Sequence, residues 1–392
     1  MLKTIVVGAG INGVTAAIEL RRRGHRVLLV DPGPLPHQLA ASTDISKAIR
    51  AAYGADEIYT ELAERSIETW RRWNMEWGED HYLETGFLFM RQRLMQPGDF
   101  EYESLKILER RGHKIERIDS VKMRKRFPAW NAELYPDGFL DRSDGYAECG
   151  RVVSALVERA RACGVELREG CRFAGLDETD ARVKGVVLQD GERISGDAVL
   201  FAIGAWTPYL LPYTSKFLRA TGHPVFHLKP RNPELFLPER FPVFGADIST
   251  TGLYGFPLGR EGVVKVANHG PGREMSPDSS QRAVTAEEER NLRALLSTSF
   301  PTLADAPIVY TRICLYCDTN DGDFWIARDP DRPGLTIAAG DSGHGFKFAP
   351  VLGDIIADAV EDKSNPLLNK FRWRPEVARG AEKEAARFLP QN

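Results

Sequence analysis

The sequence predicts an α/β fold in two domains, one built on a parallel sheet and the other on an antiparallel sheet. Three observations predict it: a β-branched strand that runs into a glycine-rich turn near residue 8, strands that alternate with amphipathic helices, and a proline-rich stretch of short strands between residues 211 and 245. The length of 392 residues exceeds what one hydrophobic core usually supports, which also favours two domains.

The composition is that of an ordinary globular protein, with 43% hydrophobic and 27% charged residues. The 52 lysines and arginines against 55 aspartates and glutamates leave a formal net charge of −3, without the basic excess of a dedicated nucleic-acid binder. No apolar run is long enough to cross a bilayer, so we expect neither a nucleic acid nor a membrane as partner.

Five cysteines are sparse and odd in number, unlike the disulfide framework of a small secreted protein. The chain opens with Met1-Leu-Lys-Thr4 and continues directly into the apolar run Ile5–Val7, which leaves no room for a signal peptide. We therefore expect a cytoplasmic protein, and an enzyme.

The first 31 residues match the fingerprint of a dinucleotide-binding βαβ unit. A strand over 5–7 runs into Gly8-Ala-Gly-Ile-Asn-Gly13, a helix follows through Leu20, and a second strand over 27–30 ends at Asp31. This acid lies 23 residues after the first glycine, close to the spacing that the fingerprint requires.

Each residue of this fingerprint has a physical task. Gly8 permits the tight turn, Gly10 lets the backbone approach a pyrophosphate, and Gly13 allows close packing of helix on strand. The helix amino terminus offers free N–H groups to the phosphates, and Asp31 accepts hydrogen bonds from ribose hydroxyls. The pattern predicts a bound dinucleotide but does not distinguish FAD from NAD.

Later elements indicate that the nucleotide-binding domain is discontinuous. An amphipathic helix over 150–163 precedes strands up to Gly204, and a further strand over 335–340 precedes a helix over 351–360. We expect residues 1–85, 146–212 and 325–392 to form a Rossmann-like domain, and residues 86–145 and 213–324 to form a substrate domain with an antiparallel sheet.

Two further segments are predicted to be helical without a chemical role. Residues 56–77 have the spacing of a helix with one buried face, whose members are Ile58, Leu62, Ile67, Trp70, Trp73 and Trp77. The tail over 376–392 has the composition of an exposed helix, and no function is assigned to it.

Chemically unusual residues gather in four segments, which are Ser42–Arg50, Leu253–His269, Ile313–Thr319 and Gly340–Phe348. In the second segment, strand alternation places Lys265 on the face opposite the valines, with His269 on the same face as Lys265. Taken alone, Lys265 also fits an ordinary surface lysine.

The other two motifs also have alternatives. In a strand over 313–319, Cys314 and Tyr316 share one face and Cys317 points to the other, so we expect neither a redox disulfide nor a metal site. Lys347 follows a glycine turn at the start of a helix, where N–H groups and the helix dipole favour an anionic ligand. His344 nearby fits a structural role.

Together the four segments resemble the monomeric sarcosine oxidase family, within the D-amino-acid-oxidase-like flavoproteins. The residues that support the resemblance are Gly8-Ala-Gly-Ile-Asn-Gly13, Ala202-Ile-Gly204-Ala-Trp206, Tyr254-Gly-Phe-Pro257, Cys314-Leu-Tyr316 and Ser342-Gly-His-Gly-Phe-Lys-Phe348. The resemblance implies an FAD-dependent amine oxidase, a monomer or homodimer, that passes a hydride equivalent from substrate carbon to the flavin. The imine product hydrolyses, and O2 is reduced to H2O2.

The resemblance also implies roles for individual residues. Cys314 matches the cysteine that bonds the flavin covalently, Lys265 the lysine that activates O2, and Arg50 and Lys347 the pair that holds the substrate carboxylate. The implied catalytic residues are Lys265, Lys47, His269, Tyr254 and Tyr316, of which Tyr254 also contacts substrate. The implied cofactor-binding residues are Gly8, Gly10, Ile11, Asn12, Gly13, Asp31, Ser42, Ser46, Lys47, Phe173, Gly204, Trp206, Cys314, Gly343, Gly345, Phe346 and Lys347.

One segment departs from the sarcosine oxidase pattern. Thr43-Asp-Ile-Ser-Lys47 stands where that family has His-Gly-Asp-Thr-Arg, and it is more similar to the Asp-x-Asn-Lys stretch of fructosyl-amino-acid oxidases, as is Cys317-Asp-Thr319. The expected substrate is therefore an N-methyl, cyclic imino or fructosyl-type amino acid. The alternatives are a flavin-dependent amine dehydrogenase that uses an acceptor other than O2, an NAD-dependent dehydrogenase, and an accessory flavin-binding subunit.

Overall fold

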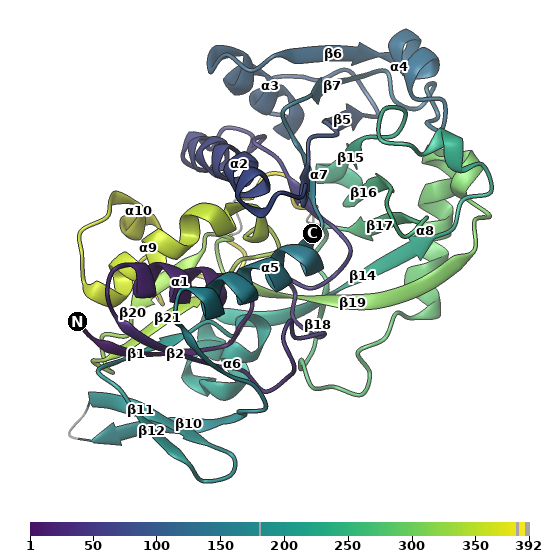
Figure 1. Cartoon of the computed structure of the whole chain (residues 1–392). Coiled ribbons are helices and arrows are strands. Elements are labelled where there is room, and N and C mark those ends of the chain that lie inside the picture. Colours follow the sequence, from purple (N-terminus) through teal and green to yellow (C-terminus); the bar gives the residue numbers. More distant parts are fainter. Residues whose placement is uncertain (180–181, 382–383, 389–392) are drawn as a thin grey trace. The chain divides into compact units, whose positions relative to one another are not determined.

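The computed structural model describes residues 1–179, 182–381 and 384–388 (Figure 1). The chain divides into two compact units of discontinuous sequence. Unit 1 consists of Met1–Ile45, Glu148–Thr221 and Leu315–Lys383, and unit 2 of Ser46–Ala147, Gly222–Cys314 and Glu384–Asn392.

Unit 1 is built on a six-stranded sheet in the order β20-β21-β13-β1-β2-β9. Neighbouring strands are parallel except for β20, which pairs antiparallel with β21 at one edge. The strand bounds are β1 Lys3–Val7, β2 Arg26–Val30, β9 Glu166–Arg168, β13 Ala198–Phe201, β20 Trp325–Arg328 and β21 Leu335–Ala339. The expected parallel sheet is present, and its central strands are β-branched and buried, as a sheet covered on both faces requires.

Helices and a small second sheet complete unit 1. Helix α1 packs against α5 and α9, and strands β10, β11 and β12 form an antiparallel sheet of their own. The bounds are α1 Ile11–Arg22, α5 Cys149–Ala162, α6 Thr207–Leu210, α9 Ala349–Glu361, α10 Pro366–Lys370, β10 Phe173–Thr179, β11 Arg182–Leu188 and β12 Arg193–Ser195. Single 3₁₀ turns cover Gly204–Trp206, Pro212–Lys216 and Phe346–Phe348.

Unit 2 contains most of a largely antiparallel sheet in the order β18-β14-β17-β16-β15-β5-β7-β6, with β19 paired to β14. The exception is the parallel pair β15 and β5. The bounds are β5 Phe87–Arg91, β6 Ile115–Asp119, β7 Asp137–Asp141, β14 Leu218–Leu228, β15 Val243–Ala246, β16 Leu253–Leu258, β17 Val264–Asn268, β18 Arg273–Glu274 and β19 Ile308–Thr319. The unit boundaries at residues 221 and 314 fall within β14 and β19.

A three-stranded sheet in the order β3-β8-β4 and several helices complete the described part of unit 2. The bounds are β3 Lys47–Ile49, β4 Tyr82–Leu83, β8 Gly145–Ala147, α2 Glu57–Trp77, α3 Phe100–Arg110, α4 Ser120–Arg126, α7 Ile248–Thr251 and α8 Ala286–Ser299, with 3₁₀ turns at Pro233–Leu235 and Pro301–Leu303. Because β3 and β4 both pair with β8, residues 46–85 lie in unit 2, whereas the expected domain division placed them with the nucleotide-binding domain.

Helix α2 forms at the predicted position. Asp56 caps its first turn by accepting a hydrogen bond from the Tyr59 N–H, and Gly78 ends it in the left-handed conformation. Four of the six residues of the predicted buried face are buried, namely Leu62, Ile67, Trp70 and Trp73. The prediction is wrong for Ile58, which is 48% exposed, because the first turn lies at the surface, where Glu57 pairs with Arg110.

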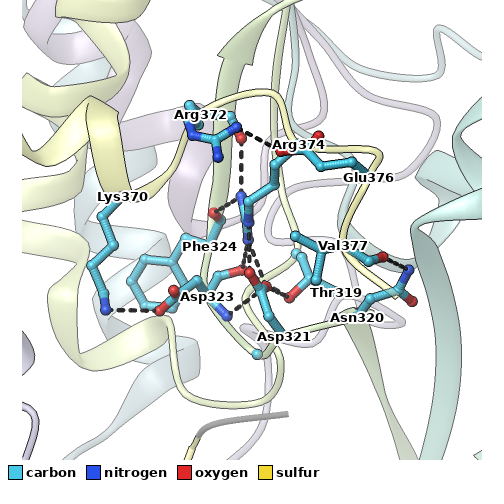
Figure 2. Close-up of polar contacts among 12 residues, drawn as sticks. Thr319, Asn320, Asp321, Asp323, Phe324, Lys370, Arg372, Arg374, Glu376 and Val377 are labelled. Atoms are coloured by element: carbon cyan, nitrogen blue, oxygen red, sulfur yellow. Dashed lines mark hydrogen bonds and ion pairs between the residues drawn. The ribbon is translucent and has the colours of Figure 1, made fainter. Parts of the chain in front are cut away.

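The C-terminal part of unit 1 is fixed by a buried ion pair (Figure 2). The Arg374 guanidinium donates to both carboxylate oxygens of Asp321 at 2.7 and 2.8 Å, and to the carbonyl oxygen of Phe324 at 3.1 Å. The Asn320 amide donates to the carbonyl oxygen of Val377 at 2.9 Å. These bonds hold the segment after α10 against the loop between β19 and β20.

In its described residues, the tail is not the exposed helix that its composition suggests; residues 382–383 and 389–392 of the predicted helix lie outside the described residues. Residues 376–381 and 384–388 form turns and irregular backbone, and Ala386 and Arg387 are buried. The Phe388 N–H donates to the carbonyl oxygen of His269, so the backbone of the last described residue is bonded to unit 2. Tertiary contacts therefore override the helix propensity of this segment. Within the described residues, no helix is long and apolar enough to cross a membrane.

A cluster of charged side chains is buried beside the start of α3. The Arg91 guanidinium pairs with Asp247, and it lies 3.5 Å from both Asp99 and Glu101. The Glu101 side chain is fully buried, and neither of its oxygens has a hydrogen-bond partner among the described residues. Burial raises the pKa of Glu101 to about 8, although Arg91 opposes the rise.

We expect Glu101→Gln to reduce the loss of folding stability that occurs as pH rises. The unfolded chain releases the Glu101 proton near pH 4.5, whereas the folded chain keeps it to about pH 8, so the folded state loses stability as pH rises through this window. Glutamine keeps the size and removes the titration. Between pH 4 and pH 8, the free energy of unfolding of wild type should therefore fall by on the order of 3–5 kcal/mol more than that of the variant.

Urea unfolding between pH 4 and pH 9 measures this difference. The matched control is Glu109→Gln, an exposed position on the same helix, which should leave the profile of wild type unchanged. Parallel profiles for wild type and Glu101→Gln would contradict the prediction.

Candidate active site

The turn between β1 and α1 in unit 1 has space for a Cβ atom at only one of its three glycines. Gly8 has a positive φ of 99°, and a Cβ there would lie 2.6 Å from the Ala202 carbonyl oxygen. A Cβ on Gly13 would lie 1.8 Å from the carbonyl oxygen of Gly8. At Gly10, in contrast, the nearest heavy atom is the Ser42 hydroxyl at 3.6 Å. Gly8 and Gly13 are therefore needed for packing, whereas Gly10 leaves the backbone accessible.

Asp31 lies at the end of β2, as predicted, and it holds the glycine turn. One of its carboxylate oxygens accepts a hydrogen bond from the Ala9 N–H at 2.8 Å and the other from the Gly33 N–H at 3.0 Å. Ser42 lies beside the same turn, where its hydroxyl accepts from the Ile11 N–H at 3.3 Å. The turn, the helix amino terminus and the acid thus have the arrangement that a dinucleotide requires.

Asn12 and Asp341 connect the start of α1 to the second glycine-rich segment of unit 1. The Asn12 amide donates to the two carboxylate oxygens of Asp341 at 2.9 and 3.1 Å. Burial raises the pKa of Asp341 to about 6, although Asn12 and Lys347 oppose the rise. The buried Oδ1 atom of Asn12 has no hydrogen-bond partner among the described residues. An unpaired buried oxygen at this turn is consistent with a ligand that supplies a donor.

The segment after Asp341 is a tight turn that leads into α9. Ser342 has a positive φ of 46°, and a Cβ on Gly343 would lie 2.1 Å from the Tyr316 ring. Lys347 is buried in the 3₁₀ turn before α9, and its ammonium group donates to the His344 carbonyl oxygen at 2.9 Å. The His344 ring bonds the Gly322 carbonyl oxygen at 3.0 Å, which is a structural role.

The remaining cofactor-binding candidates of unit 1 lie in its core and turns. The Phe173 ring packs edge-on against Phe201, 4.8 Å between centroids, within the hydrophobic core. Gly204 has a positive φ of 53° in the 3₁₀ turn that also contains Trp206. Gly345 packs against Asp341, where a Cβ would lie 2.5 Å from Cγ, and Phe346 begins the next 3₁₀ turn.

In unit 2, the predicted alternation along β17 is confirmed. Val264 and Val266 belong to the hydrophobic core, while Lys265 projects from the opposite face and is only 1% exposed. The Lys265 ammonium donates to the Ser46 carbonyl oxygen and lies 4.8 Å from the ring centroid of Phe256, its partner across the β16–β17 pair. Lys265 is therefore not a surface lysine but a buried cation with an oxygen and an aromatic face as neighbours.

A second cation of unit 2 lies beside the first cysteine of the Cys-x-x-Cys pair. The Lys47 ammonium is 3.3 Å from the Cys314 sulfur, and Cys314 is buried. The hydroxyl of Ser46, the residue before Lys47, is buried without a hydrogen-bond partner among the described residues. Cys317 is buried in an apolar core, and burial raises the pKa of its thiol. The described residues contain no cluster of three or more His, Cys, Asp or Glu side chains that could hold a metal ion.

The third cation of unit 2 is paired with a residue that sequence analysis missed. Arg50 Nη2 donates to Glu384 Oε1 at 2.8 Å, and Glu384 Oε2 lies 2.7 Å from His269 Nε2. Burial lowers the pKa of His269, although Glu384 opposes this effect. The Tyr254 ring lies 6.4 Å from the His269 ring. Nothing in the sequence indicates Glu384, because it lies in the tail that was predicted to be an exposed helix.

The structure thus groups the site candidates into two sets. Unit 1 contains the glycine turn with Asn12, Asp31 and Ser42, together with Phe173, Gly204, Trp206, Tyr316, Gly343, Gly345, Phe346 and Lys347. Unit 2 contains Ser46, Lys47, Arg50, Tyr254, Lys265, His269 and Cys314.

A family model described as FAD dependent oxidoreductase (DAO) matches residues 3–359. The chain belongs to this family. The dinucleotide that the glycine turn predicts is therefore FAD, which decides between the two cofactors that the fingerprint alone leaves open. The Gly8–Gly13 turn, Asp31 and the unpaired Asn12 oxygen are the features of unit 1 that fit it.

Curated relatives and solved structures agree with this assignment. L-Saccharopine oxidase of Schizosaccharomyces pombe is 29% identical over 95% of this chain and 94% of its own length. A monomeric sarcosine oxidase of a Bacillus species is 28% identical over 90% of each chain. The structure of a deglycating fructosamine oxidase from Aspergillus fumigatus, amadoriase II, has a TM-score of 0.84 at 26% identity and covers 99% of this chain and 94% of that chain. The expected fold class and the family resemblance are confirmed.

We expect the glycine turn to respond differently to alanine at two positions. Gly13→Ala places a methyl group 1.8 Å from the Gly8 carbonyl oxygen, so the protein should lose roughly 3 kcal/mol of stability or fail to fold. Gly10→Ala has room in the protein, and Gly10 has an ordinary φ of −68°, so folding should survive while bound FAD falls. Thermal unfolding and the ratio of visible flavin to protein absorbance measure the two effects. Equal losses of stability in both variants would contradict the prediction.

Proposed function

We propose that the protein is an FAD-dependent amine oxidase that converts an N-substituted amino acid to an imine and reduces O2 to H2O2. The observation that supports it best is the buried ammonium of Lys265, held between a carbonyl oxygen and an aromatic ring in unit 2. The relatives are named for saccharopine, sarcosine and fructosamine, which share a secondary amine. The substrate class follows from this shared group.

FAD, when bound, supplies the acceptor of the hydride equivalent that leaves the substrate carbon. Unit 1 would hold its nucleotide part, with the Gly10 backbone available to the pyrophosphate and Asp31 to the ribose hydroxyls. The Asp31 carboxylate is oriented for this task by the Ala9 and Gly33 N–H groups.

Lys265 is proposed to favour electron transfer to O2. An ammonium group fixed in a site with little water stabilises the negative charge that O2 acquires, and it needs no rearrangement when the charge develops. The Ser46 carbonyl oxygen and the Phe256 ring fix its position.

Cys314 is proposed to bond FAD covalently through its sulfur. The ammonium of Lys47 at 3.3 Å stabilises negative charge on this sulfur, and the thiolate is the nucleophilic form of cysteine.

Lys347 and Arg50 are the proposed partners of the substrate carboxylate, and Tyr254, Tyr316 and His269 the proposed neighbours of the amine. His269 is neutral at pH 7 because burial lowers its pKa. A neutral ring that donates Nε2–H to Glu384 keeps Nδ1 as an acceptor.

Anaerobic visible spectroscopy tests the proposal. Sarcosine, pipecolate, L-proline and fructosyl-glycine are added in turn to the FAD-loaded protein, and at least one of them should bleach the flavin. Admission of air should restore the colour and produce H2O2. Good reduction of a dye with poor turnover on O2 would overturn the oxidase assignment in favour of a dehydrogenase, and flavin that none of these amines bleaches would overturn the proposed substrates.

We expect Lys265→Met to slow the reaction with O2 by roughly 10² to 10³-fold, because a buried cation is replaced by an apolar side chain of similar length. Anaerobic reduction of the flavin by the amine should change only a few-fold, because that step does not depend on charge transfer to O2. Lys265→Arg keeps the charge and should recover part of the lost rate. Stopped-flow measurement of each half-reaction checks this, and equal slowing of both would show that Lys265 does not act on O2.

We expect Cys314→Ser to release the flavin from denatured protein, and Cys317→Ser to leave it attached. The two cysteines lie three residues apart on β19; Cys314 has the Lys47 ammonium beside its sulfur, whereas Cys317 packs in a hydrophobic core. Flavin fluorescence of the protein band after denaturing electrophoresis measures attachment. Flavin that stays with the protein band in Cys314→Ser, or that dissociates from denatured wild type, would contradict the covalent bond.

A further inference from the structure

Arg282 of unit 2 contacts the strand that carries Cys314. It lies in the segment between β18 and α8, and its Nε donates to the carbonyl oxygen of Ile313, the residue before Cys314, at 3.3 Å. A second nitrogen, Nη1, donates to the Pro277 carbonyl oxygen at 3.5 Å. The side chain is half-buried, and none of the roles proposed above uses it. The guanidinium is thus held beside the backbone of Cys314.

The charge of Arg282 interacts with the Cys314 sulfur. Burial lowers the pKa of Arg282, and the neighbouring cation Arg312 lowers it further, whereas negative charge on Cys314 opposes this decrease. Cys314 opposes it more strongly than Asp278 or Tyr310 does. Because the interaction between two charged groups is mutual, Arg282 stabilises the Cys314 thiolate by the same free energy.

Cys314 has cations around it from three segments of unit 2. The Lys47 ammonium, at the start of β3, is 3.3 Å from the sulfur. Arg312 precedes Cys314 by two residues on β19, so strand alternation places both on the same face. Arg282 comes from the segment after β18, with Asp278 as the carboxylate in its surroundings. Cations beside a cysteine favour its thiolate form, and burial of the sulfur reduces the screening of their charge.

We propose that Arg282 is a positioning residue for flavin attachment, which acts by holding Cys314 in its thiolate form together with Lys47. This inference rests on the proposed covalent bond between Cys314 and FAD. Attachment forms a bond between the sulfur and a methyl carbon of the flavin. One hydrogen leaves the thiol and one leaves the methyl group, and O2, the acceptor of the proposed reaction, takes both up with two electrons as H2O2. Because the thiolate is the form that attacks carbon, its fraction sets the rate of attachment.

The pH dependence of attachment tests the proposal. The full chain is isolated without flavin, FAD is added in air, and attachment is followed by flavin fluorescence of the protein band after denaturing electrophoresis. At pH 7, Arg282→Gln should attach FAD about tenfold more slowly than wild type, because a smaller fraction of Cys314 is thiolate. The two rates should converge as pH rises to 10, where the thiol ionises without the cation. Arg282→Lys keeps the charge and should stay within about threefold of wild type.

Alkylation of the flavin-free chain by iodoacetamide gives a second measurement, which in wild type needs no variant and no flavin. Mass spectrometry of peptides distinguishes the cysteines, and Cys163, which is exposed, is the internal reference. In wild type, the alkylation rate of Cys314 should reach its plateau at a lower pH than that of Cys163. Arg282→Gln should move only the Cys314 profile to higher pH. The matched control is Arg290→Gln, an exposed position on α8, which should leave both profiles unchanged.

Three results would overturn the inference: a Cys314 profile in wild type that does not lie below that of Cys163, equal attachment rates in wild type and Arg282→Gln at pH 7, or a slow attachment in Arg282→Gln that persists at pH 10. The last would indicate a structural role. The first needs no variant, so a misfolded Arg282→Gln does not protect the proposal. Wild type that never attaches FAD would overturn the proposed covalent bond instead, while the alkylation profiles would still decide the effect of Arg282 on the sulfur.

Discussion

The burial of positive charge is the constraint on which the chemistry of unit 2 depends. Lys265 is 1% exposed and Arg50 4%, and an ionised group out of water is unfavourable unless oriented dipoles or opposite charges replace the solvent. The chain supplies a different replacement for each cation: the Ser46 carbonyl oxygen for Lys265 and the Glu384 carboxylate for Arg50. These partners come from separate segments. The burial of Lys265 on β17 depends on the segment before β3, and the burial of Arg50 after β3 depends on the tail.

Aromatic rings are the second kind of group that contacts these buried cations in place of water. Phe256 lies under Lys265 and Tyr53 beside Arg50, with the cation in each case within 5 Å of the ring centroid. Strand alternation explains how β16 provides such a face, because Tyr254 and Phe256 point away from the core that Leu253 joins. Both cations are buried, and the effect of a fixed charge on a developing negative charge is strongest where solvent does not screen it.

Sequence alone predicted those features that depend on local spacing. The glycine turn, Asp31 at the end of β2 and the position of Lys265 opposite the valines all follow from periods of two or from a short motif, and the structure confirms each placement. Glu384 could not be found in this way, because its partner Arg50 is 334 residues away. The tail composition favours a helix, and tertiary contacts, among them those with Arg50, His269 and Gly270, override that propensity. The exposed Ile58 shows the same limit, since periodicity does not reveal where a helix leaves the core.

A motif specifies which side chain is present, but its surroundings decide what that side chain can do. Cys314 and Cys317 lie on one strand, three residues apart, and alternation sends them to opposite faces. The first meets the Lys47 ammonium, and the second enters an apolar core that keeps its thiol protonated. Arg50 illustrates the same principle with charge. Arg50 donates to the Glu384 carboxylate of the chain itself, so a carboxylate ligand that binds Arg50 must share this arginine with Glu384.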